Sequence, residues 1–166
     1  MQPRHDHGSM SQDMMQKHYR LLGLNLLLSL VIMYVAMFAM IWSWGAFIQN
    51  LNFFYMALVM WAPMAIVMML TMGMMYKNKK LNMILYAGFA LIFLLSWWGI
   101  RDQSLVGDKQ FVRSMIPHHS GAILMCNEAS LKDAEIRNLC FAPNGIVQSQ
   151  EREIAQMKTI LKRLQQ

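Results

Sequence analysis

The feature that most constrains this chain is the stretch from Leu21 to Tyr76, which contains no Asp, Glu, Lys or Arg. A second uncharged, apolar stretch runs from Leu81 to Ile100. A helix needs roughly 20 apolar residues to cross a lipid bilayer, and a hydrophobic content of 56% does not suit a soluble globular protein. The polar pair Gln49-Asn50 divides the longer stretch. The sequence therefore predicts three transmembrane helices, at residues 21–48, 51–76 and 81–100.

Basic residues indicate how these helices are oriented. They lie before the first predicted span and between the second and third, whereas the turn between the first two spans has no charge. Loops rich in Lys and Arg stay on the cytoplasmic side, so we expect a multi-pass protein of the inner (cytoplasmic) membrane with a cytoplasmic N-terminus. Residues 101–166 are then extracytoplasmic, in the periplasm of a bacterial-type cell. The first run is too long for a signal-peptide core of about 7–15 residues and is expected to remain as an anchor.

The polar parts on either side of the spans differ in character. Residues 1–20 contain several His and Met residues, lack an apolar pattern, and are expected to form a mobile tail. Residues 101–166 show helical periodicity. The helices predicted there are Asp108 to about Ala129, a short helix capped by Asp133, and Ile146 to about Leu164. We expect an all-α fold, with three membrane helices followed by a small antiparallel helical bundle.

The net charge of +6 does not indicate a nucleic-acid-binding protein. Six of the fifteen Lys and Arg residues lie before the first span or between the second and third. The other basic residues lie in residues 101–166, where they are nearly balanced by acidic residues. No basic stripe or aromatic platform accompanies them. The sequence also lacks a Ser-His-Asp pattern, a phosphate-binding loop and paired acid–base carboxylates. We expect a binding protein and not an enzyme.

The segment MIPHHSGAILMC, residues 115–126, places two histidines among sulfur-containing side chains. On a regular helix, with roughly 100° per residue, the adjacent rings of His118 and His119 point in different directions. Either Pro117 distorts the helix and brings the rings together, or they serve different sites, or one faces a neighbouring subunit. One side of the helix carries Met115, His119 and Cys126, and another side carries His118 and Met125.

Sulfur and imidazole together favour a soft metal ion. Thioether, thiolate and imidazole ligands suit Cu(I) and, by extension, Ag(I), whereas Mg²⁺ and Ca²⁺ prefer oxygen. Zinc is a weaker alternative, because two His and two Cys residues can form its tetrahedron but leave the methionines without a role. The candidate metal ligands are His118, His119, Met115, Met125, Met157 and Cys126.

Two structural alternatives accompany this metal hypothesis. The histidines can be capping or hydrogen-bonded residues, with the methionines as ordinary core side chains. Cys126 and Cys140 are the only cysteines, and both lie in the predicted extracytoplasmic part. A disulfide between them and metal ligation therefore both remain open.

Methionines also recur within the predicted spans. A row spaced by four residues in the second span comprises Met56, Met60, Met64, Met68 and Met72. Each step of four drifts by about 40° around a helix, so the row winds. It could pass Cu(I) across the bilayer, or the methionines could replace leucine in lipid-facing and packing positions. The spans contain no ionisable residue, which argues against a proton-coupled pump.

The chain after residue 20 resembles a known family. The region from about Asp108 to Leu164 is similar to the family called domain of unknown function 305, through the motifs MIPHHSGAILM and QEREIAQM. The segments SWG, NLNFFYMA and NKKLN resemble its membrane-anchored branch, which has three helices before the domain. The chain departs from the family pattern at CFAPNGIV, where the family usually continues as a helix. This departure affects the expected length of the second helix and the position of Cys140.

The resemblance implies a ferritin-like helical fold, and copper or silver binding through Met and His in metal tolerance outside the cytoplasm. By position it points to the ligands Met115, His118, His119, Met125 and Met157. We therefore expect a membrane-anchored Cu(I)- or Ag(I)-binding sink or chaperone, with a second copy or a metal-handling protein as a partner. The alternatives are a copper transport path along the Met rows and a metal-free helical interaction module. A weaker hypothesis assigns metal sampling to the N-terminal residues His5, His7, His18, Met10, Met14 and Met15.

Overall fold

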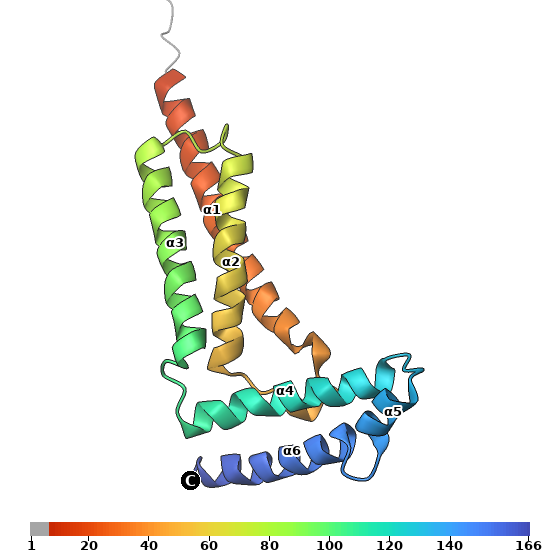
Figure 1. Cartoon of the computed structure of the whole chain (residues 1–166). Coiled ribbons are helices and arrows are strands. Elements are labelled where there is room, and N and C mark those ends of the chain that lie inside the picture. Colours follow the sequence, from red (N-terminus) through yellow and green to blue (C-terminus); the bar gives the residue numbers. More distant parts are fainter. Residues whose placement is uncertain (1–6) are drawn as a thin grey trace, which may run out of the picture.

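The computed structural model describes residues 7–166, with side chains from residue 13 onward. These residues form helices and turns without a strand, which confirms the predicted all-α class. The elements are α1 (His7–Ala36), η1 (Met37–Met40), η2 (Trp44–Ala46), α2 (Leu51–Thr71), α3 (Lys79–Asp102), α4 (Asp108–Glu128), α5 (Ala134–Phe141) and α6 (Ile146–Arg163). Helices α1, α2 and α3 form a bundle. The antiparallel pair α4 and α6 lies across one end of this bundle (Figure 1).

Three helical segments are long and apolar enough to cross a membrane, as predicted. They are Asp13–Met40, Leu51–Thr71 and Lys79–Asp102. Their shared core contains the fully buried Ala62 and Ala65, whose small side chains allow close approach of the helices. Within this core the Trp61 indole Nε1 donates a hydrogen bond of 2.8 Å to the Leu26 carbonyl oxygen. This bond satisfies a polar group that would be costly to leave unpaired in an apolar interior.

Helix α1 starts earlier than the sequence indicated. Residues 7–20 were expected to be part of a mobile tail, but they are helical and continuous with the first span. This stretch has no glycine or proline between Gly8 and Gly23, so helix propagation meets no breaker there. The part of the expected tail at residues 1–6 lies outside the described residues.

The first span also ends earlier than residue 48. Helix α1 stops at Ala36, and residues 37–50, which we call the elbow, contain only the short turns η1 and η2. Helix α4 supplies hydrogen-bonding partners to the elbow backbone. The Trp42 amide donates to Ser120 Oγ at 2.8 Å, and Arg113 Nε donates to the Gln49 carbonyl at 2.8 Å. These long-range bonds replace the helical bonds that a continuous span would make.

The outer helices follow the prediction closely. Helix α5 begins after Asp133, whose side chain accepts hydrogen bonds from the amides of Glu135 and Ile136, as expected for an N-cap. Helices α4 and α6 pack around a small core of Ala46, Val112, Ile116 and Leu161. Helix α4 is continuous through Pro117, so the expected distortion does not interrupt it. The elbow thus contributes Ala46 to the core of the outer helices.

A disulfide joins Cys126 of α4 to Cys140 of α5. Both cysteines are buried. The structure therefore favours the disulfide over metal ligation, the two roles that the sequence left open. The bond links helix α5, which has only eight residues, to the longer helix α4.

Gly145, between α5 and α6, gives a stability prediction. A Cβ atom there would lie 2.9 Å from the carbonyl oxygens of Leu139 and Ala142 and 3.0 Å from that of Cys140. Backbone oxygens cannot swing aside, so we expect Gly145→Ala to lower the free energy of unfolding by about 1–3 kcal/mol. Thermal unfolding followed by circular dichroism measures this effect. The control is Gly88→Ala, which has open space around the new Cβ; an equal loss in both variants would contradict the explanation.

Candidate metal centre

His119 is held between α4 and α6 by both of its ring nitrogens. The imidazole is buried, with Nδ1 2.9 Å from the Met115 carbonyl oxygen and Nε2 2.7 Å from Glu153 Oε2. The Met115 carbonyl oxygen accepts from Nδ1–H, and the contact of Nε2 with the Glu153 carboxylate is an ion pair when the ring is protonated. The Glu153 side chain is half exposed. It therefore remains free to move away from the ring into solvent.

The His119–Glu153 pair sets the register of the antiparallel helices α4 and α6. Met115 lies one turn before His119, and Met157 lies one turn after Glu153. Antiparallel packing in this register places Met115 and Met157 opposite one another, one turn from the ion pair. Both methionines are partly buried, and Met157 packs against the core of the outer helices. We call Met115, His119, Glu153 and Met157 the inner group.

His118 occupies a different environment from His119. The His118 side chain is exposed, and its ring centroid lies 6.1 Å from that of His119 at an interplanar angle of 64°. Because α4 is not interrupted at Pro117, the rings diverge as on a regular helix. Met125, on the same side as His118 and two turns further on, is 58% exposed. The predicted ligands therefore separate into the inner group and an exposed outer pair, His118 and Met125.

Cys126 does not join either set. Its sulfur is bonded to Cys140, so it has no thiolate to offer a metal ion in this state. This pairing removes both cysteines from the zinc alternative as well. Within the described part of the chain, no three His, Cys, Asp or Glu side chains lie close enough together to hold a metal ion. A metal site on α4 and α6 would therefore depend on methionine sulfur.

Two features of this region were missed by the sequence analysis. The pairing of Glu153 with His119 was not predicted from the sequence. The feature that could have indicated it is the position of Glu153 one turn before Met157 on the same predicted helix. The elbow was read as part of a membrane helix. It passes close to α4 beside the histidines, since a Cβ on Gly121 would lie 3.4 Å from the Met40 carbonyl oxygen.

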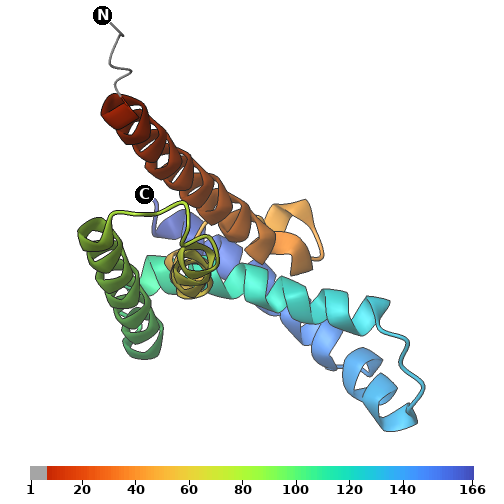
Figure 2. The same cartoon turned by 90° about the horizontal axis from the view of Figure 1, so that it is seen from above.

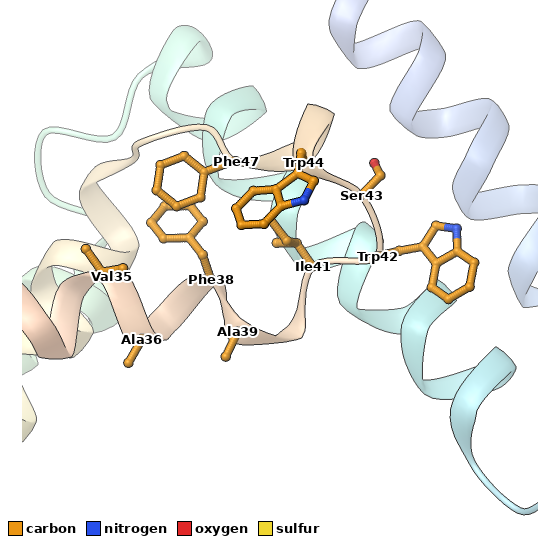
Figure 3. A pocket seen from close by; sticks show the side chains of 9 residues that line it. All are labelled: Val35, Ala36, Phe38, Ala39, Ile41, Trp42, Ser43, Trp44 and Phe47. Atoms are coloured by element: carbon orange, nitrogen blue, oxygen red, sulfur yellow. The ribbon is translucent and has the colours of Figure 1, made fainter.

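The elbow also encloses an apolar cavity of about 490 Å³ (Figure 3). Phe38 and Phe47 lie against each other there, with ring centroids 4.3 Å apart, and Trp44 is 87% exposed beside them. The lining contains no ionisable side chain; it consists of Val35, Ala36, Phe38, Ala39, Ile41, Trp42, Ser43, Trp44 and Phe47. Its tryptophans are typical of a membrane–water interface. The cavity supplies no metal ligand.

The methionine row of α2 winds around its helix, as its spacing predicts. Met56 and Met60 are each 44% exposed on the surface of the bundle, whereas Met64 and Met68 are partly buried against its core. Met72 is again exposed. In a single copy the thioethers therefore do not line one continuous side of α2, which weakens the transport alternative.

Comparison with known proteins matches part of this chain to one family. The family described as Domain of unknown function (DUF305) matches residues 64–161. An uncharacterized protein of Acanthamoeba polyphaga mimivirus is 34% identical over 114 residues, which cover 68% of this chain and 71% of that protein. No solved structure matches the chain. The matched region includes α3, α4 with the two histidines, α5, and α6 as far as Leu161.

Proposed function

The chain belongs to the DUF305 family, and from that premise we propose that it is a membrane-anchored protein that binds Cu(I) or Ag(I) on its extracytoplasmic helices α4 and α6. Helices α1, α2 and α3 are the anchor in the inner membrane. The protein acts as a metal sink or chaperone outside the cytoplasm, and not as a catalyst. Its partners are the metal ion, the lipid bilayer and a protein that delivers or receives the ion.

The orientation of His119 carries this proposal. Its Nδ1–H donates to the Met115 carbonyl, which fixes the ring and directs Nε2 toward Glu153. Histidines that bind metals commonly donate their other ring N–H to a carbonyl or carboxylate in this way. A soft cation that binds Nε2 would displace the hydrogen-bonded contact with Glu153, and a proton held between the two groups would pass to solvent beside the half-exposed carboxylate. The half-exposed carboxylate then moves aside while its negative charge stays near the bound ion.

Methionine supplies the selectivity. Met115 and Met157 stand opposite each other in the register fixed by His119 and Glu153, each one helical turn along its own helix from that pair. Thioether and imidazole donors together suit Cu(I), and by extension Ag(I), better than Zn²⁺, which favours thiolate and imidazole. The exposed outer pair, His118 and Met125, offers the same two ligand types to an arriving ion. We assign it to loading and transfer.

The double variant Met115→Leu/Met157→Leu tests the inner group. Leucine has nearly the volume of methionine, so the fold should be retained, but both thioethers are lost. We expect the affinity for Cu(I) to fall roughly tenfold or more, measured by competition with a chromogenic Cu(I) chelator.

The matched control is Met64→Leu/Met68→Leu, which makes the same chemical change within α2 and should leave the affinity unchanged. The control variant also tests the transport alternative, because a metal path along α2 requires it to reduce Cu(I) flux into vesicles. An unchanged affinity in the Met115→Leu/Met157→Leu protein would exclude the inner group as the site.

A further inference from the structure

A second set of soft donors lies at the other end of the molecule. The start of α1 and the loop between α2 and α3 are at the end of the bundle opposite α4 and α6 (Figure 1), and Figure 2 views the molecule from that end. A cavity of about 570 Å³ opens there. Its lining residues are Met14, Met15 and His18 of α1, and Met74, Met75, Lys77 and Asn78 of the loop. Four methionines and one histidine, from two segments far apart in the sequence, therefore line one cavity.

Hydrogen bonds beside the cavity hold these two segments together. The Tyr19 hydroxyl donates to Asn82 Oδ1 at 2.6 Å, and Asn82 Nδ2 donates to the Tyr76 carbonyl at 2.6 Å. The rings of Tyr19 and Tyr76 also pack against each other, with centroids 5.4 Å apart. Tyr19 directly follows His18, and Tyr76 directly follows Met75. Residues next to the candidate metal ligands His18 and Met75 are thus held in place by contacts that do not depend on a bound ion.

Burial differs among the donors in a way that suits an ion arriving from solvent. Met15, His18 and Met75 are partly buried and form the inner lining, whereas Met14 is 62% and Met74 is 92% exposed. The exposed thioethers are unbranched and flexible, so they can close over an ion. The cavity needs no rearrangement of the helices to admit one.

The chemistry of the lining selects a class of ion. It has no carboxylate, and its one side-chain amide oxygen, from Asn78, already accepts a hydrogen bond from the Leu81 amide, so the lining does not suit ions that require several oxygen ligands, such as Mg²⁺ and Ca²⁺. The ammonium of Lys77 lies on the same lining and repels a divalent cation twice as strongly as a monovalent one. Thioether sulfur and imidazole suit soft ions. The ion that meets both conditions is soft and monovalent, namely Cu(I) or Ag(I).

We propose that Met14, Met15, His18, Met74 and Met75 form a second site for a soft monovalent metal ion, separate from the inner group. The earlier hypothesis placed metal sampling on a mobile N-terminal tail alone. The structure instead adds two methionines from the α2–α3 loop and places them with α1. The chain then carries soft donors at both ends of its candidate membrane spans. This second site uses none of the residues on α4 and α6, so it stands without the proposed function.

The test is a calorimetric titration of the full-length protein with Ag(I) in neutral detergent. The variants compared with the natural protein are Met14→Leu/Met15→Leu/Met74→Leu/Met75→Leu and His118→Ala/His119→Ala. We expect the methionine variant to lose one Ag(I) equivalent per chain and the histidine variant to keep that equivalent. The matched control, Met56→Leu/Met60→Leu/Met64→Leu/Met68→Leu, should bind as the natural protein does.

The outcomes separate the two sites. If the methionine variant keeps its full stoichiometry, the second site does not exist, whatever happens at α4 and α6. If the histidine variant binds normally while the methionine variant loses all binding, the second site holds and the proposed function fails. Should the fourfold variant not fold, as judged by circular dichroism, His18→Gln replaces it. That variant should weaken one equivalent roughly tenfold, and unchanged binding would overturn the proposal.

Discussion

Replacing both His118 and His119 by alanine is expected to remove one Cu(I) equivalent per chain. His119 of α4 faces α6, and its ring is oriented by a hydrogen bond to the Met115 carbonyl oxygen. Alanine at position 119 removes both the imidazole and this hydrogen bond. Because even the loss of a residue that only orients a metal ligand commonly costs 10–100-fold in affinity, we expect loss of the ligand itself to cost at least about 100-fold. Competition with a chromogenic Cu(I) chelator, in ascorbate to keep the copper reduced, measures both the stoichiometry and the affinity.

The single variants distinguish the two rings. His119→Ala should account for most of the affinity loss, because His119 is buried and fixed between two helices. His118→Ala should mainly slow loading, since the His118 ring is exposed and has no part in the inner group. His119→Ala should also lower the stability, because removing a buried imidazole leaves a cavity between α4 and α6, whereas loss of the contact with the half-exposed Glu153 adds little to that cost. Equal effects of the two single variants on affinity would contradict this division.

Removing the disulfide with Cys126→Ser/Cys140→Ser is expected to destabilise the outer helices by about 3 kcal/mol. The bond joins residues separated by 14 positions in the chain, and closing a loop of this length removes about that much entropy, as free energy, from the unfolded state. The helix most affected is α5, which has eight residues and is too short to be stable alone. Chemical denaturation monitored by circular dichroism, with and without a thiol reductant, measures the effect.

The natural protein should lose the same stability when its disulfide is reduced. The double serine variant, which has no thiol, should not respond to the reductant and so serves as the control. It also decides the role of Cys126, since a metal site that needs this sulfur would lose Cu(I) in the variant. We expect the Cu(I) affinity of the variant to be unchanged in the folded protein. Unaltered stability after reduction would mean that the bond does not hold α5 in place.

Hydropathy and periodicity were sufficient to predict most of the fold. The three candidate spans follow from uncharged runs of membrane length, and α4, α5 and α6 follow from apolar spacing and from caps such as Asp133. These signals are local, so they can be read from a single sequence. They failed at the elbow because its apolar composition imitates a continuing span. The partners that end the helix there, such as Ser120, lie far along the chain.

The divergence of the two histidines was predictable from the sequence, but the pairing of His119 with Glu153 was not. The spacing of the histidines and methionines on one helix correctly separated His118 from His119. The contact between His119 and Glu153 joins residues separated by 34 positions, and it depends on the register of α4 against α6. A single sequence does not specify that register. For the same reason, two cysteines alone could not show whether they bind each other or a metal ion.

The measurement that tests the central claim most directly is a Cu(I) titration of the full-length protein against a chromogenic chelator, with Zn²⁺ titrated in parallel. Thermal unfolding is recorded with and without the ion, because a ligand that binds only the folded state must stabilise it. We predict that Cu(I) competes with the chelator and raises the unfolding temperature, whereas Zn²⁺ has a much weaker effect. Failure of the protein to take Cu(I) from the chelator, with the same unfolding temperature in both conditions, would contradict the assignment and favour a metal-free interaction module.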